Sequence, residues 1–98
     1  MGPEHLYLVT YDISDEKRWR VVFRLMHGYG EWMQFSVFQC RLARVRYLEL
    51  VGKLEAAISR TDDSVMIVDI GPAESVSPRL NSLGKRGFVP SERKAIIV

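Results

Sequence analysis

The chain has 98 residues and a mass of 11.3 kDa; 47% of its residues are hydrophobic, 27% are charged, and the formal net charge is +2. This size and composition predict one globular domain over residues 1–98, and they exclude a disordered chain. The single cysteine, Cys40, excludes an intrachain disulfide, and no Cys and His residues have the spacing of a zinc site.

The N-terminal third of the chain predicts a strand followed by a helix. Residues 5–12 are nearly all apolar and rich in β-branched and aromatic side chains, which is typical of a buried central strand. Ser14 is the expected N-cap of the helix, and Gly28 and Gly30 are the expected stop after about Tyr29.

This first helix is expected to be amphipathic. At 100° per residue, an apolar face contrasts with a basic face made by Lys17, Arg20, Arg24 and His27. Arg18 lies at the edge of the apolar face, where a guanidinium group needs a carboxylate partner. The apolar face consists of Trp19, Val22, Phe23, Met26 and Tyr29.

The middle of the chain predicts two short strands and a second helix. Residues 31–42 contain two β-like stretches around Ser36, which indicates a tight hairpin or a sharply bent strand pair. A helix is expected over residues 44–59, with Glu49 and Lys53 as an outward i, i+4 ion pair. Its expected core face is formed by Tyr47, Leu50, Val51, Leu54 and Ile58.

The last third begins with a turn at Asp62-Asp63, followed by a strand over residues 64–70 that Gly71-Pro72 ends. Residues 73–93 are expected to be loop, with a short helical turn over residues 78–83. Residues 95–98 are apolar and predict a short strand at the C-terminus.

The resulting order, β-α-β-β-α-β with an added strand, predicts an α+β fold of the ferredoxin-like kind, with both helices on one face of an antiparallel sheet. Residues 1–71 would form the core and residues 72–98 a loop and a terminal strand. The other sheet face and the edge strands need cover in so small a domain. We therefore expect the terminal strand to join the sheet of a second copy, giving a homodimer with exchanged tails.

The charges are unevenly distributed along the chain. Residues 16–46 carry a net charge of +5 and residues 79–98 of +4, and the segment between them carries −4. Two basic stretches favour a nucleic-acid partner, but a solvated helix face gives the same pattern. The apolar runs are far shorter than the roughly 20 residues of a membrane helix. We therefore expect a cytoplasmic protein that does not bind membranes.

Asp12 is the strongest candidate for chemistry, because it ends a buried strand just before a helix. It could bind a metal ion, or it could cap the helix or pair with Arg18, and the sequence does not decide between these roles. One carboxylate holds Mg²⁺ poorly, so a two-fold axis near Asp12 would have to bring a second. Such a metal could activate water and stabilise a phosphodiester transition state. Asp15, Glu16 and Asp69 are weaker candidates.

Three segments, residues 7–20, 28–42 and 94–98, closely resemble the CRISPR-associated protein 2 family. The specific features are Tyr-Asp-Ile at the end of the first strand and the later Gln-x-Ser-Val-Phe motif. The resemblance implies a ferredoxin-like homodimer that acts with the CRISPR-associated protein 1 integrase to acquire new spacers in defence against viruses. It also implies an endonuclease that uses Mg²⁺, or Mn²⁺ in its place, to cleave single-stranded RNA or double-stranded DNA. The alternative is a non-catalytic, DNA-binding scaffold that bridges integrase dimers.

The resemblance also assigns site residues. The catalytic, metal-binding aspartate of the family matches Asp12. Where many members have a basic residue in the second strand, this chain has Trp32, which removes that basic contact. The further positions that match residues around the family's nucleic-acid cleft are Tyr11, Lys17, Arg18, Arg20, Ser36 and Phe38.

Overall fold

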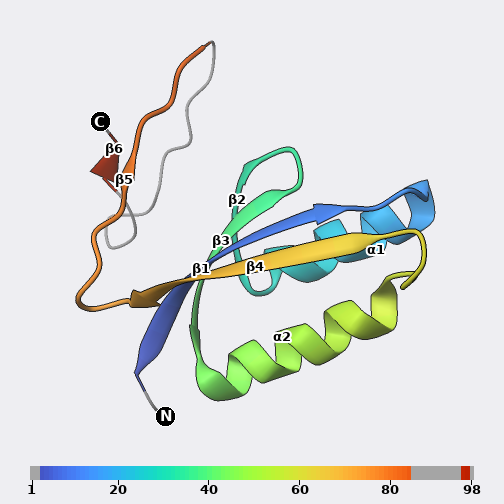
Figure 1. Ribbon diagram of the computed structural model, residues 1–98, viewed down its shortest axis with the longest axis horizontal. Coiled ribbons are helices and arrows are strands. Elements are labelled where there is room, and N and C mark those ends of the chain that lie inside the picture. The colour runs from blue at the N-terminus through green and yellow to red at the C-terminus, as the bar shows by residue number, and fades with distance from the viewer. Residues whose placement is uncertain (1–2, 85–95, 98) are drawn as a thin grey trace.

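The structure, a computed structural model, describes residues 3–84 and 96–97 (Figure 1). The main elements are β1 (Glu4–Asp12), α1 (Glu16–His27), β2 (Gly30–Gln34), β3 (Val37–Ala43), α2 (Arg44–Ala57) and β4 (Ser64–Pro72). Two short strands, β5 (Arg79–Leu80) and β6 (Ile96–Ile97), follow. None of the helices described is long and apolar enough to cross a membrane.

The four long strands form one antiparallel sheet in the order β2-β3-β1-β4. This is the predicted α+β, ferredoxin-like arrangement, with β1 in the interior of the sheet. The two helices lie on the same face, because their buried residues join strand residues of one face in a single core. The side chains at the centre of this core are Val9, Val22, Met26, Phe38, Cys40, Leu50 and Leu54.

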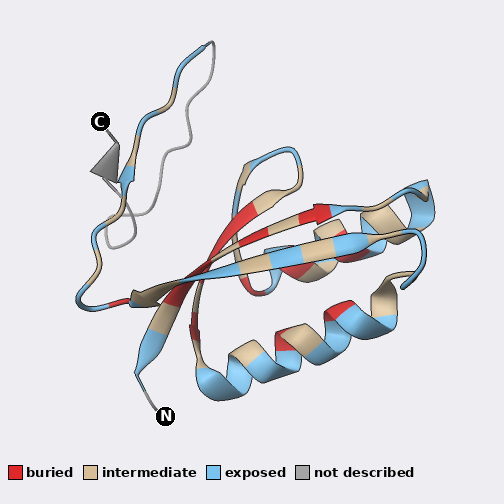
Figure 2. Ribbon diagram, in the orientation of Figure 1, coloured by how far each residue is buried: buried red, intermediate tan, exposed pale blue. Residues whose placement is uncertain are grey.

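Burial alternates along β1 from Tyr7 to Asp12, and Leu6 before them is also buried (Figure 2). Tyr7, Val9 and Tyr11 point toward the helices and are buried, whereas Leu8 and Thr10 on the opposite face are half-buried. The prediction of a strand buried throughout is therefore corrected, since helices cover only one face of the sheet. We call the opposite face the open face.

Helix α1 begins one residue later than the sequence suggested. Asp15, not Ser14, is the N-cap: its backbone is extended and its carboxylate accepts a hydrogen bond from the Arg18 amide. Either side chain can satisfy a free amide of the first turn. Ser14 is instead bonded to Asp63, and this contact takes up the hydroxyl that would otherwise cap the helix.

Helix α2 has the predicted buried face, and Glu49 and Lys53 attract each other as expected, but the direct partners of Glu49 are different residues. Glu49 accepts hydrogen bonds from the Tyr29 hydroxyl at 2.6 Å and from Arg46 at 2.8 Å. The ammonium group of Lys53 lies 5.5 Å from the centre of the Tyr29 ring. A tertiary contact with Tyr29 therefore adds to the local attraction between Glu49 and Lys53.

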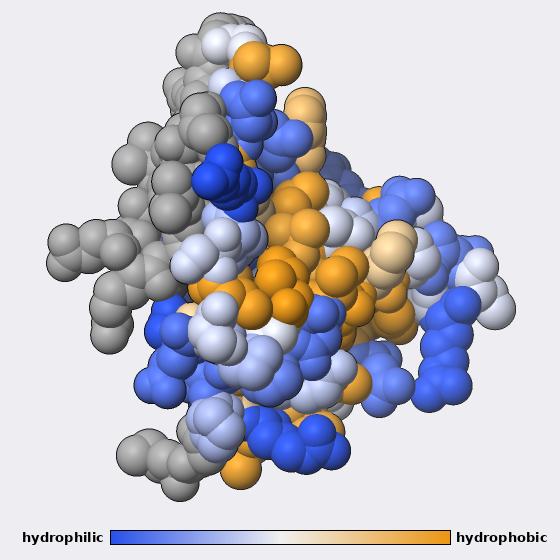
Figure 3. Space-filling view, turned by 60° about the vertical axis from the view of Figure 1, so that its left-hand side comes forward, coloured by the Kyte–Doolittle hydropathy of each residue, from blue (hydrophilic) through white to orange (hydrophobic). Residues whose placement is uncertain are grey.

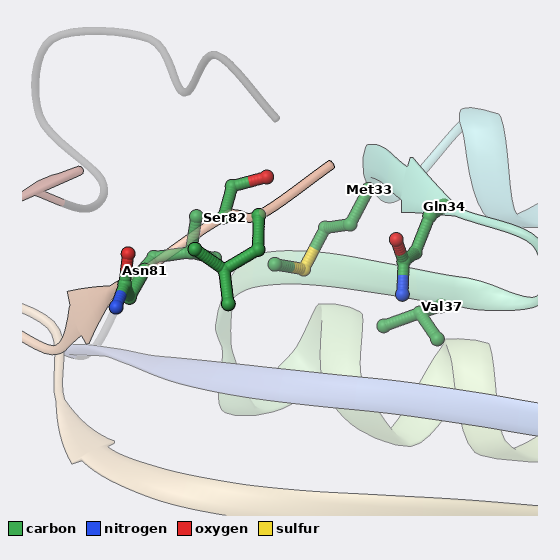
Figure 4. A pocket seen from close by; sticks show the side chains of 7 residues that line it. Met33, Gln34, Val37, Asn81 and Ser82 are labelled. Carbon is green, nitrogen blue, oxygen red and sulfur yellow. The ribbon is translucent and has the colours of Figure 1, made fainter. Parts of the chain in front are cut away.

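The segment after β4 also differs from expectation. The helical turn expected over residues 78–83 is wrong, because Arg79 and Leu80 form β5, which pairs in parallel with β6 of the same chain. Of the predicted terminal strand, residues 95 and 98 lie outside the described part. Residues 80–83 line a pocket with Met33, Gln34 and Val37 of the β2–β3 hairpin, so this segment passes beside the hairpin (Figure 4).

Candidate functional site

Asp12 is an exposed residue at the end of β1, opposite Ser64 at the start of β4. Asp15 caps α1 and Asp63 pairs with Arg18, so both structural roles considered for Asp12 are filled by other residues. Within the described residues the Asp12 carboxylate has neither a hydrogen bond nor an ion pair. It is therefore open to solvent and to a ligand.

Asp63 fixes the loop that follows Asp12. Its side chain is inaccessible to solvent and accepts hydrogen bonds from three segments of the chain. From the β1–α1 loop, Ser14 donates its amide at 3.0 Å and its hydroxyl at 3.2 Å. From α1, Arg18 donates Nε at 2.8 Å and Nη2 at 3.2 Å. From the segment just after α2, the Ser59 amide donates at 2.8 Å.

These hydrogen bonds keep the Asp63 carboxyl group ionised. The hydrogen bonds from Arg18 lower the pKa of the Asp63 carboxyl far below its usual range, and those from the Ser59 and Ser14 amides lower it further. Burial opposes this shift, but it is the smaller effect. The same pair raises the pKa of the Arg18 guanidinium. Both groups are therefore charged at neutral pH and hold the loop together.

Arg18 has the carboxylate partner that the sequence predicted, and this changes its expected role. Two of its nitrogens bind Asp63, and Nη2 also donates to the Ser14 hydroxyl at 3.3 Å. About a third of its side chain, 32%, is exposed. Arg18 is therefore held within the fold through Nε and Nη2, and its assignment as a nucleic-acid contact stays a prediction.

Tyr11 and Ser36 do come together, and Trp19 joins them. The Tyr11 amide donates to the Ser36 carbonyl at 3.1 Å, and the Trp19 indole donates to the Ser36 hydroxyl at 3.1 Å. The Tyr11 hydroxyl is buried and has no hydrogen bond of acceptable geometry. Burial raises the pKa of Tyr11, and the nearby Ser36 side chain opposes this in part. These residues tie the hairpin to the end of β1.

Phe38 lies in the core and not at a surface. Its side chain is fully buried and its ring contacts those of Tyr11, Phe23 and His27. The interpretation of Phe38 as a cleft residue is therefore corrected: it acts through packing, because the helix-facing side of β3 is covered by α1.

The basic face of α1 is present as predicted. Lys17, Arg20, Arg24 and His27 are all exposed. Arg20 pairs with Glu16 at 2.9 Å, but both side chains are mostly in solvent, where such pairs are weak and readily exchanged. This face can therefore bind phosphate groups without losing a buried contact.

The described residues hold no group of three or more carboxylate, His or Cys side chains that could bind a metal. Asp12 is an oxygen ligand of the kind Mg²⁺ prefers, but Mg²⁺ needs further ligands. One chain therefore fits the predicted metal in part, and a second carboxylate, water or a phosphate must complete the site.

Sequence reasoning missed Asp63, Trp19 and Phe35 as residues of this region. Asp63 was interpreted as part of a turn. Pairing the end of β1 with the start of β4 would have placed residue 63 beside residues 12–14. The signal for the contact with Asp63 was the position of Arg18 on the apolar face, where its guanidinium group needs a carboxylate partner. Three other acidic residues nearby in the sequence could equally have been that partner.

The family model and the most similar relatives found by comparison with known proteins all belong to one family. The family described as CRISPR associated protein Cas2 matches residues 5–76. A Geobacter sulfurreducens protein named CRISPR-associated endoribonuclease Cas2 is 48% identical over 97% of this chain and 99% of its own length. A Rhodospirillum rubrum protein named CRISPR-associated endoribonuclease Cas2 1 is 52% identical over 97% of this chain and 92% of its own length.

A solved structure agrees with these matches. The crystal structure of a hypothetical protein from Thermus thermophilus superposes with a TM-score of 0.74 and 31% sequence identity. The superposition covers 90% of this chain and 99% of the other.

The Asp63 contacts predict a pH-dependent stability. Because folding lowers the pKa of Asp63, its contribution to stability is complete above the unfolded value of about 4 and is lost as the pH falls toward the folded value. We expect Asp63→Asn to lower the melting temperature at pH 7 by several degrees and to flatten its decrease between about pH 5 and pH 2. Thermal unfolding followed by circular dichroism measures both.

Asp62→Asn is the matched control, because Asp62 is exposed and accepts only a long 3.4 Å hydrogen bond from Ser59. It should behave like the wild type. An Asp63→Asn protein with the wild-type melting temperature at every pH would show that Asp63 does not hold this loop.

Proposed function

The chain belongs to the CRISPR-associated Cas2 family, and we propose that it is a homodimeric, Mg²⁺-dependent endonuclease that cleaves phosphodiester bonds. The names of its relatives, which describe endoribonucleases, favour RNA as substrate. We propose single-stranded RNA, with double-stranded DNA as the second possibility. Mn²⁺ would serve in place of Mg²⁺.

The observation that carries this proposal is the free carboxylate of Asp12. Nearby polar side chains are bound within the fold: Asp63 to Arg18, Asp15 to the α1 amide, and Ser36 to Trp19. Asp12 is exposed at the end of a strand, and its carboxylate has no partner in the described residues. A carboxylate that the fold does not use is free for a metal or a substrate.

The chain's own residues would divide the work as follows. Asp12 would be the metal ligand, with Asp12 of a second copy as the other carboxylate. When bound, the metal would supply an activated water and stabilise negative charge on the phosphate. Lys17 and Arg20 would bind flanking phosphates, with an affinity that falls steeply as salt rises. The buried Asp63–Arg18 pair would keep the loop after Asp12 in place.

The open face supports the homodimer. Met66 pairs with Thr10 and Val68 pairs with Leu8, so all four lie on this face. Met66 and Val68 are 64% and 44% exposed, and an apolar area is visible at the centre of Figure 3. A second copy would bury these side chains, and its tail would extend the sheet.

In the cell, we propose that the dimer acts with the CRISPR-associated protein 1 integrase in acquiring new spacers for defence against viruses. The alternative is a non-catalytic scaffold that bridges integrase dimers along DNA. The scaffold is favoured by one observation: among the described residues, Asp12 belongs to no group of three or more side chains that could bind a metal. Both functions would use the same basic face of α1.

Substitution of Asp12 separates these functions. We expect Asp12→Asn to lower the rate of Mg²⁺-dependent cleavage of single-stranded RNA by at least about a hundredfold, the usual scale for losing a catalytic group. Because the Asp12 carboxylate makes no hydrogen bond or ion pair with the described residues, the melting temperature should not fall. Cleavage of matched RNA and duplex DNA, with Mg²⁺ or EDTA, measures the loss and the preferred substrate.

Asp62→Asn is again the control and should cleave normally. Equal trace cleavage by the wild type and Asp12→Asn would indicate a contaminating nuclease and contradict the catalytic proposal. Retained binding of duplex DNA and integrase by a wild type that cleaves nothing would support the scaffold.

The dimer is tested at the open face. We expect Met66→Lys to weaken self-association at least tenfold, because it places a charge in the centre of the proposed interface. Sedimentation velocity over a range of protein concentrations measures the change. Val45→Lys is the control, since Val45 is 78% exposed on the outer side of α2. A Met66→Lys protein as dimeric as the wild type would exclude this face as the interface.

A further inference from the structure

Phe35 at the tip of the β2–β3 hairpin is an unusual residue. Its side chain is 82% exposed, and its backbone has a positive φ of 44°, the only such value outside glycine among the described residues. Left-handed backbone favours Gly or Asn, and a bulky side chain there is a true outlier. An aromatic ring in water adds a second cost. Folding alone therefore favours another residue at this position.

The fold nevertheless holds Phe35 firmly. On one side, the Trp32 indole donates to the Phe35 carbonyl at 2.7 Å. On the other side, Ser36 is bonded to the Tyr11 amide and the Trp19 indole. Trp32 itself is 40% exposed and packs edge-on against Phe23 of α1. The exposed ring is thus presented in a fixed place, and strain kept in a well-anchored tip points to function.

The tip lies beside the candidate site. In the ladder, Thr10 pairs with Val37, and the Tyr11 amide bonds to the Ser36 carbonyl. Phe35 and Asp12 are the next residues along the chain from this hydrogen-bonded pair, Phe35 before Ser36 and Asp12 after Tyr11. Trp32, which anchors the tip, packs against Phe23 of α1, the helix that carries the exposed basic residues. The exposed aromatic residue is therefore held at the same end of β1 as Asp12, on a hairpin that contacts the basic helix.

We propose that Phe35, anchored by Trp32, stacks on an unpaired nucleobase of a single-stranded nucleic acid whose backbone passes Asp12. Single strands are bound by aromatic rings that stack on bases together with basic side chains that bind phosphates, and this region offers both. In a duplex the bases already stack on each other, so the Phe35 ring would add little to the affinity for a duplex. Phe35 would thus select single strands.

This inference deepens the proposed nuclease function and rests on it for the substrate passing Asp12. The neighbouring charge favours nucleic acid over an apolar protein partner as the occupant. Lys17 and Arg24 have no ion pair in the described part of the chain, so they remain available to phosphates. Trp32 acts as a positioning residue, because its indole hydrogen bond fixes the tip.

The test compares two oligonucleotides with the same number of phosphates, an oligothymidylate and a fully abasic strand. Their binding to the full chain is followed by fluorescence anisotropy in EDTA, where Mg²⁺-dependent cleavage is off. We expect the wild type to prefer the strand with bases by at least about fivefold, the lower limit for one stacked base. Phe35→Asn should remove this preference and leave binding of the abasic strand unchanged.

The stability of the same variant separates function from folding. Asn tolerates the left-handed backbone and is polar, so Phe35→Asn should melt at the wild-type temperature or above it. Phe35→Tyr should keep the preference, and Val45→Asn, which removes an exposed apolar side chain elsewhere, should also keep it.

Several results would overturn the proposal. These are a wild type with no preference for bases, a Phe35→Asn protein that keeps the preference, and an equal loss of affinity for both strands. A change in sedimentation without a change in binding would assign the tip to a protein interface instead.

RNA cleavage is measured as a separate result, so that the two proposals can fail independently. A protein that cleaves RNA without base preference refutes the stacking alone. A protein with base preference but no cleavage refutes the nuclease alone.

Discussion

The buried carboxylate of Asp63 holds together three parts of the chain that lie outside the paired strands. It accepts hydrogen bonds from the loop after β1, from the first turns of α1 and from the segment just after α2. A buried charge is costly unless it is paired and fully hydrogen-bonded, and these donors meet that need. Loss of one donor group would leave the others facing an incompletely paired charge, so the arrangement is cooperative. The geometry of the loop next to Asp12 depends on it.

This arrangement gives two neighbouring aspartates opposite roles. Asp63 is inaccessible to solvent and used up by the fold, whereas Asp12 is exposed and has no partner among the described residues. Arg18 pairs with Asp63, so our proposal assigns phosphate binding to Lys17 and Arg20. In the same proposal, one chain provides one carboxylate of a metal site, beside an open sheet face. A second copy would supply the missing carboxylate and would cover the open face. This is why we propose a dimer as the working unit.

Much of the fold could be predicted from the sequence, because hydrophobic periodicity identifies the strands and helices directly. The order of the elements then led to the ferredoxin-like sheet, and the place of Arg18 on the apolar face led to its need for a carboxylate. Which carboxylate could not be predicted, since Asp63 is 45 residues away and reaches Arg18 only through the pairing of β1 with β4. The choice of Asp15 over Ser14 as the cap follows from the same contact.

Other features of the site depend on backbone geometry that residue types do not report. The positive φ of Phe35 and its anchoring by Trp32 arise from the hairpin's closure. The burial of Phe38 follows from which side of β3 faces α1. A family motif marks such positions but does not say whether the side chain points to solvent or to the core. The strand at residues 79–80 depends on a partner strand far along the chain.

The most direct test of the division between Asp12 and Asp63 is to locate the metal on the protein. In a titration with Mn²⁺, a paramagnetic ion, amide NMR signals near the bound ion broaden first. We expect selective broadening of Tyr11, Asp12 and Ile13 in the wild type and its disappearance in Asp12→Asn. Broadening that persists in Asp12→Asn, or that centres on another part of the chain, would contradict Asp12 as the metal ligand.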